Sequence, residues 1–170
     1  MKMDNALHLE ERAKKLVEKL NDDPESPWFR QIRMTGNAKG LISKEILIKK
    51  LKPLLSERRR GILHLYSIDE QFGILRNYFA TTKIVFPNRA DFFNQETAFN
   101  FLMSLLPTIF QLCLSKYNDF KIASISEILS CIKENHSLDG NCLRNGSTAC
   151  AKEILPVINK CFKETLKAKL

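Results

Sequence analysis

The chain has 170 residues, 44% of them hydrophobic, which is enough for one domain with its own core without metals or disulfides. Its formal net charge of +8 favours an anionic partner, nucleic acid or an acidic protein surface, although a solvated lysine-rich surface explains the charge equally well. No apolar run approaches the roughly 18 residues that a membrane span needs, so we expect no membrane partner.

The first predicted elements are a helix over 6–20 and a short β-hairpin near residues 29–43. Apolar residues recur at i, i+3 and i+4 through 6–20, and Pro24 ends this helix because the residue before a proline avoids the α region. Residues 28–34 alternate like a strand, and 40–42 follow a glycine turn as the return strand. A lone hairpin is marginally stable, so we expect it to pack on helices.

The next helix is predicted over 44–55, with Ser43 as its N-cap and Pro53 ending or bending its last turn. A basic run follows it at 58–60, and with Gly61 it forms an exposed connection.

Capping-box patterns mark two of the later helices, because a serine followed three residues on by a glutamate satisfies two backbone donors. The pattern at Ser67 predicts a helix over 68–85, and the pattern at Ser124 predicts one over 125–135. A very apolar core helix is predicted over 95–117, and a last helix over 148–168. The sequence therefore predicts a mainly α protein: one domain over 1–170 with about six helices, in which 1–22 is a loosely docked arm.

The five cysteines are odd in number and include no C-x-x-C pair, so neither a disulfide framework nor a zinc ribbon is indicated. The sequence shows no secretory signal peptide, and we therefore expect reduced thiols in a cytoplasmic protein. Most of the thiols should lie in the core, where free cysteine behaves as a small hydrophobic residue.

Catalytic patterns are weak. The three histidines (His8, His64 and His136) fall in different predicted elements, and none has the spaced partner of a metal-binding helix. Asp22, Asp23 and Glu25 could do acid–base work or hold a divalent metal, but acidic residues beside a proline more simply form a turn. We therefore expect no enzyme, no catalytic residue, no metal and no cofactor.

The basic residues after position 48 are the stronger indication of function. Such a cluster can contact phosphates, and Trp28 or Tyr66 could stack on bases. The alternative is that these cations cap the C-terminus of a helix and line a solvated loop. The candidate nucleic-acid-binding residues are Lys49, Lys50, Lys52, Arg58, Arg59 and Arg60.

Residues 20–55 resemble the carboxy-terminal helical region of the DGQHR-domain family. The similarity rests on LNDDPESPWF at 20–29, on Ile-Arg-Met at 32–34 followed by a glycine turn, and on Leu-Lys-Pro-Leu-Leu at 51–55. Weaker similarities extend it over most of the chain, at 74–79, 85–87, 99–107 and 146–149.

The resemblance implies a bacterial protein from mobile elements or DNA-defence loci, a family that includes a repressor-like member of the DNA phosphorothioation system. The motif that names the family lies in an upstream α/β core related to the ParB and sulfiredoxin-like fold, and this sequence lacks that core. No active-site residue of the family can therefore be assigned here.

Two functions remain open. In the first, the chain is a non-enzymatic module for protein association, with Trp28 and Phe29 as interaction candidates and with a second copy or a separately encoded DGQHR-type core as partner. A homodimer is then expected, because the surface that would pack on the missing core is exposed. In the second, the protein binds DNA through the Lys49–Arg60 cluster and regulates transcription.

Overall fold

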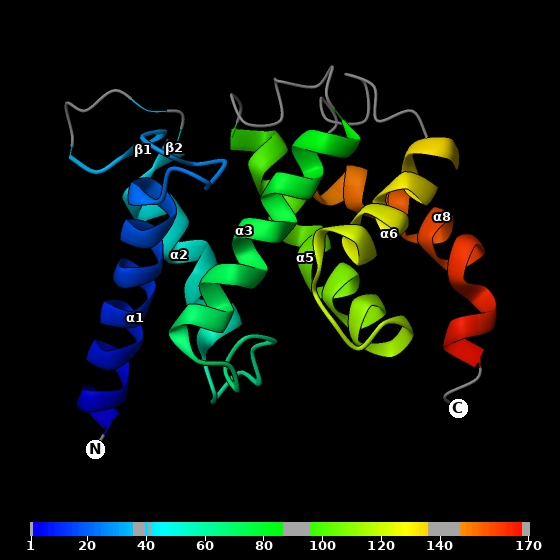
Figure 1. Ribbon diagram of the computed structural model, residues 1–170. Coiled ribbons are helices and arrows are strands. Elements are labelled where there is room, and N and C mark those ends of the chain that lie inside the picture. The colour runs from blue at the N-terminus through cyan, green and yellow to red at the C-terminus, as the bar shows by residue number, and fades with distance from the viewer. Residues whose placement is uncertain (1, 36–39, 41, 87–95, 136–146, 168–170) are drawn as a thin grey trace. The chain divides into compact units, whose positions relative to one another are not determined.

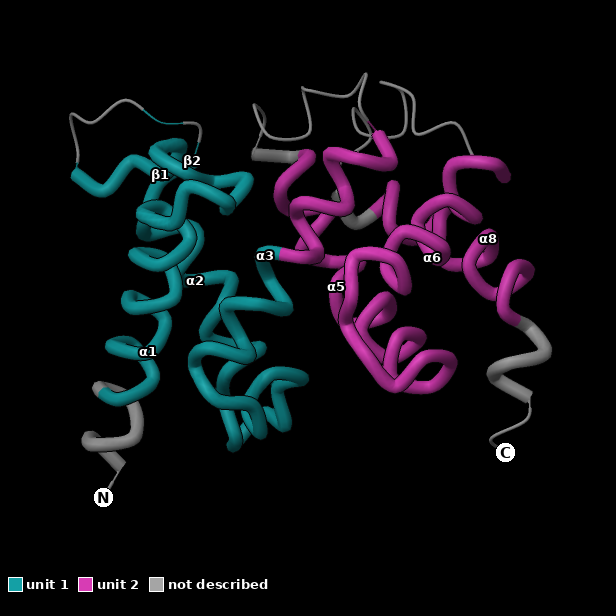
Figure 2. The backbone as a smooth tube through the Cα atoms, in the orientation of Figure 1, with its two compact units in different colours: residues 1–76 teal, residues 77–170 magenta. Residues whose placement is uncertain are grey.

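The computed structural model describes residues 2–35, 40, 42–86, 96–135 and 147–167 (Figure 1). Within the helices, the side chains of 2–7, 96–97, 147–148 and 163–167 are also outside the description. Six helices and one pair of short strands form the described chain, so the predicted mainly α class is confirmed. The chain divides into two compact units, 1–76 and 77–170, and α3 (Ile68–Val85) runs from one into the other (Figure 2).

The first unit is built on two packed helices, α1 (Lys2–Asp22) and α2 (Lys44–Leu55). The helix predicted over 6–20 is present and longer, and the bounds predicted for α2 are those observed. Ser43 is its N-cap, because its hydroxyl accepts a hydrogen bond from the Ile46 amide at 3.2 Å. The apolar stripes of the two helices are fully or almost fully buried: Ala13, Leu16, Val17 and Leu20 from α1, and Leu47, Ile48, Leu51 and Leu55 from α2.

The two strands are β1 (Ile32–Arg33) and β2 (Ile42–Ser43), which pair with Ile32 opposite Ile42. They lie inside the region predicted for a hairpin, but they run parallel. Residues 28–31 form hydrogen-bonded turns rather than a strand, which leaves only two residues on each side to pair. Both isoleucines are buried, so the small sheet contributes to the core of this unit.

The second unit contains α5 (Glu96–Lys116), α6 (Ile122–Asn135), α8 (Ser147–Lys167) and the end of α3. The predicted core helix is confirmed in α5, whose buried residues occur on more than one face, as at Phe99, Phe101 and Leu102. Tyr78 of α3 donates a hydrogen bond to the Leu102 carbonyl oxygen at 2.6 Å. Because its ring is completely buried, the pKa of this phenol is strongly raised and the hydroxyl stays protonated.

The start of α6 differs from the prediction. Ser124 is inside the helix and buried, and its hydroxyl donates to Asp119 Oδ1 at 2.6 Å. The same oxygen accepts from the Lys121 amide at 3.0 Å, whereas Glu127 forms an ion pair with Lys116. The helix therefore begins earlier, at Ile122, and Asp119 holds the turn before it through the Lys121 amide and the Ser124 hydroxyl.

The expectation that no apolar run approaches the length of a membrane span is wrong. Residues 98–116 of α5 are long and apolar enough to cross a membrane, although most of this stretch is buried inside its unit, as in the core helix of a soluble protein.

The cysteines are not all reduced either: Cys131 of α6 is bonded to Cys161 of α8, and Cys150 is also disulfide-bonded. Cys113 is free, and its burial raises the pKa of the thiol to about 12. Cys142 lies outside the described residues. Spacing along the chain could not reveal the pair, because it is the packing of α6 and α8 that brings the two cysteines together.

Candidate binding groove between α1 and α2

The candidate site of the first unit begins with the outward face of α2. Its residues recur at i, i+3, i+4, i+7 and i+8, which places them on one side of a helix. Only Ile48 of this set is buried, so the face is largely available to solvent. The residues are Glu45, Ile48, Lys49, Lys52 and Pro53, and Ser56, the C-cap of α2, follows them.

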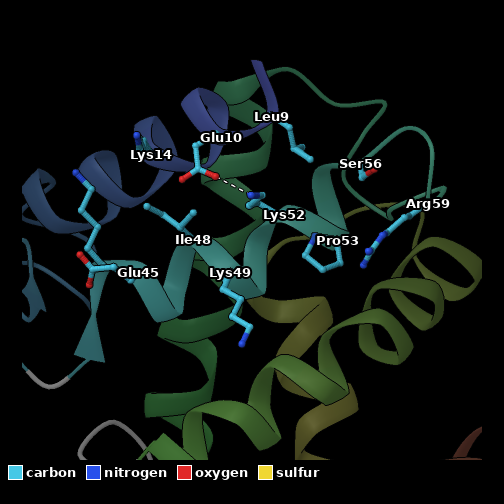
Figure 3. A pocket seen from close by; sticks show the side chains of 11 residues that line it. Leu9, Glu10, Lys14, Glu45, Ile48, Lys49, Lys52, Pro53, Ser56 and Arg59 are labelled. Carbon is cyan, nitrogen blue, oxygen red and sulfur yellow. Dashed lines mark hydrogen bonds and ion pairs between the residues drawn. The ribbon is translucent and has the colours of Figure 1, made fainter. Parts of the chain in front are cut away.

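This face forms a groove of about 620 Å³ together with Leu9, Glu10 and Lys14 of α1, Lys44 at the start of α2, and Arg59 after α2. We call it the basic groove. Figure 3 shows Lys14 and Glu45 toward one end and Ser56 and Arg59 toward the other, with Glu10 and Lys52 joined between them. Five cationic side chains and two carboxylates thus surround a short apolar floor that Leu9, Ile48 and Pro53 provide.

Two ion pairs connect the helices. Lys52 Nζ lies 2.7 Å from Glu10 Oε2, and Lys44 Nζ lies 3.7 Å from Glu18 Oε1. As the residue number rises on α2 it falls on α1, so the two helices run antiparallel along the groove. The hydrogen bond from Lys52 is the main cause that lowers the pKa of Glu10, so this carboxylate is ionised at neutral pH.

The charge of the groove is uneven along its length. At the Arg59 end, Lys49 and Arg59 are exposed, and Lys52 is bonded to Glu10. At the opposite end Lys14 is exposed, but Lys44 is already paired with Glu18, and the exposed carboxylate of Glu45 lies next to Lys44 in sequence. The Arg59 end is therefore the more strongly cationic half.

The turn that carries Arg59 is held against the end of α2. The Gly61 amide donates to the Ser56 carbonyl oxygen and the Leu63 amide to the Leu54 carbonyl oxygen, both at 2.9 Å. Buried Gln71 of α3 secures the next residues, because its Nε2 donates to the carbonyl oxygens of Leu63 and Tyr66 at 2.8 Å. Arg59 is thus presented by a hydrogen-bonded turn.

The structure brings only part of the predicted basic cluster together. Lys49, Lys52 and Arg59 line the groove, whereas Lys50, Arg58 and Arg60 do not. Lys50 follows Lys49 by one residue and so points away by about 100° on the helix. All three arginines are exposed.

Trp28 and Phe29, the predicted interaction residues, lie differently from each other. Trp28 is completely buried, so it is not available to stack on a base or to meet a partner. Phe29 is partly exposed, and the Arg30 guanidinium lies 4.9 Å from its ring centre. Asn21 holds this segment, because its backbone oxygen accepts from the Arg30 amide and its side-chain oxygen from the Ile32 amide.

The acidic cluster and His64, which the sequence offered for chemistry, make structural contacts in the described part of the chain. Asp23 Oδ1 accepts from the Glu25 amide at 2.8 Å, which is a turn, and Glu25 pairs with Arg76 at 3.7 Å. His64 Nδ1 lies 2.6 Å from the Gly61 carbonyl oxygen and so belongs to the turn after α2. Among the described residues, no group of three or more histidine, cysteine or acidic side chains could hold a metal ion.

The sequence reasoning missed Lys14 and Lys44 as members of the site. Both belong to predicted helices, but nothing in a single sequence says that the polar edge of one helix faces that of the other. One signal could have found these pairs. Each joins opposite charges, and a single antiparallel alignment of the two predicted helices places Glu18 beside Lys44 and Glu10 beside Lys52.

Searches of protein-family models, of curated proteins and of solved structures found no match to this chain, so the DGQHR resemblance stays a prediction from its residues.

Proposed function

We propose that this chain is a non-enzymatic helical binding module that associates with another protein through the basic groove. The observation that carries the proposal is the groove itself, in which exposed cations surround the apolar side chains of Leu9, Ile48 and Pro53. Helix pairs of this kind can receive a third segment, with apolar contacts supplying affinity and charges supplying specificity.

The partner that fits the resemblance is a separately encoded DGQHR-type core protein in the cytoplasm of a bacterium that carries a mobile element. A homodimer is the competing form of association. The net charge of +8 disfavours it at this groove, because a second copy is itself basic. A dimer interface also needs neighbouring apolar residues, and the large hydrophobic residues exposed in the described chain come from four separate segments. They are Leu65, Ile84, Ile122 and Leu155.

Light scattering of the full chain, alone and mixed with a DGQHR-type core protein, tests association. We expect a monomer alone and a defined complex in the mixture, with the complex weakened by Lys49→Glu. A dimer of the chain alone, unaffected by that change, would support self-association through another surface. A monomer in both samples would contradict the proposed function.

DNA binding is the second candidate, favoured by the exposure of Arg58, Arg59 and Arg60 on one ordered turn. It predicts weak, micromolar affinity whose logarithm falls linearly with the logarithm of salt concentration. Replacing the three arginines with glutamine should remove most of this affinity and flatten the salt dependence. Undetectable binding to a duplex at low salt would dismiss this candidate.

A further inference from the structure

The Arg59 end of the basic groove has a chemistry specific enough to name an occupant. We propose that it receives an acidic amphipathic helix of the partner, with a carboxylate among Lys49, Lys52 and Arg59 and an aliphatic side chain on Ile48 and Pro53. This inference rests on the proposed function and specifies which chemistry the partner brings.

Charge complementarity decides the class of occupant. Lys49 and Arg59 are exposed at this end, and the single carboxylate that lines it, Glu10, is already bonded to Lys52. A duplex would also be attracted, but of the three exposed arginines only Arg59 lines the groove, and a phosphate backbone makes no use of the apolar floor beside it. None of the lining residues is aromatic, so a single strand would find no stacking surface there.

The apolar floor argues for an amphipathic segment rather than a small acid. Ile48 and Pro53 lie on one face of α2, with Lys49 and Lys52 between them in sequence. An incoming helix presents residues three and four apart on one face, so a leucine one turn from a glutamate reaches both the floor and the cations. The groove of about 620 Å³ has room for such side chains along one face.

Glu10 has a defined role in this arrangement, because its carboxylate accepts a hydrogen bond from Lys52 when no partner is bound. Its bond to Lys52 must be shared or exchanged when a foreign carboxylate enters. Removing the negative charge of Glu10 therefore frees a cation and removes a repulsion, and it should strengthen binding. A purely structural ion pair between α1 and α2 would not produce this gain.

The test is fluorescence anisotropy with a labelled synthetic helix that repeats glutamate and leucine about one turn apart, and with a scrambled peptide of the same composition. We expect the patterned peptide to bind the full chain and the scrambled peptide to bind at least about tenfold more weakly.

Charge reversals locate the site. Lys49→Glu with Arg59→Glu should weaken binding about tenfold or more, whereas the matched control Lys50→Glu with Arg58→Glu changes net charge equally and should have an effect of less than about threefold. Glu10→Gln should tighten binding about two- to fivefold, the range that a partly exposed ion pair affords.

Three results overturn the inference: no preference for the patterned peptide, equal losses from the groove pair and the control pair, or a duplex that binds more tightly than either peptide. If the peptide fails but the core protein still forms a complex in light scattering, the proposed function stands and only the acidic-helix assignment is lost. If both assays fail, both proposals are wrong.

Discussion

At the scale of single residues, Gly61 determines where the basic turn lies. A β-carbon at this position would overlap the carbonyl oxygens of Pro53 and Leu54, so only glycine lets the chain pass so close to the end of α2. The sequence predicted that Gly61 belongs to a connecting segment. The reason for a glycine there is that the backbone at this position passes close to the backbone at the end of α2, and no local sequence pattern shows that contact. Gly73 of α3, by contrast, has open space around it.

Gly61→Ala should therefore destabilise the protein by about 1–3 kcal/mol, because the new methyl group must push the turn away from α2. Gly73→Ala is the matched control and should stabilise by about 0.5–1 kcal/mol, since alanine is the better helix former and meets no neighbour. Urea denaturation of the two variants measures both effects. Equal changes in the two variants would contradict the close approach.

At the scale of elements, most helix bounds follow from local signals. Ser43 caps α2 and the Ser67–Glu70 capping box starts α3 as predicted, because such caps act within a few residues. The same pattern failed at α6, where Ser124 lies inside the helix and its hydroxyl donates to Asp119. A motif states which bonds a serine can make, but packing decides whether that serine lies at the end of a helix or inside it.

The hydrogen bonds that the Asp119 carboxylate accepts predict a pH dependence of stability. The hydroxyl of Ser124 and then the Lys121 amide lower the pKa of this carboxyl in the folded protein. A lowered folded pKa stabilises the protein above the unfolded value of about 3.9, and this contribution is lost as pH falls through the folded pKa.

Asp119→Ala should lower Tm at pH 7, and its difference from the parent should narrow as pH drops below about 4. Asp119→Asn keeps a hydrogen-bond acceptor without the charge, so its Tm at pH 7 should lie between that of Asp119→Ala and that of the parent protein. Calorimetry across this range checks both variants. A Tm difference for Asp119→Ala that stays constant down to acid would show that the charge is not involved.

At the scale of the whole molecule, the division into two units separates the candidate binding function from the disulfide. The basic groove belongs entirely to residues 1–76, and the Cys131–Cys161 bond to 77–170. Reducing the second unit should therefore change stability without removing any group that lines the groove.

Cys131→Ser with Cys161→Ser should destabilise the protein by about 3–4 kcal/mol, because the bond closes a loop of roughly 30 residues in the unfolded chain. Denaturation with and without reductant measures the effect. The double variant with reductant added is the control, since any remaining shift then belongs to the disulfide of Cys150. An unchanged midpoint in the double variant would contradict a stabilising role for the bond.

The proposed cytoplasmic location makes a separate prediction, because glutathione and thioredoxin keep thiols reduced in that compartment. Rapid alkylation inside the producing cells, followed by mass spectrometry, tests this location against the observed disulfide. Mostly free thiols at Cys131 and Cys161 would fit the cytoplasm, and a fully oxidised pair would place the protein in an oxidising compartment.

The sequence alone determined the helical class, the bounds of α2 and α3 and the candidate cations Lys49, Lys52 and Arg59, since periodicity, caps and charge are local properties. Tertiary structure alone decided which of these cations share a groove, that Trp28 is buried, and that Cys131 meets Cys161. Those facts depend on how helices far apart in the chain pack together. Packing energy is spread over many apolar contacts, so a single sequence specifies the stripe that each helix buries but not the helix that it meets.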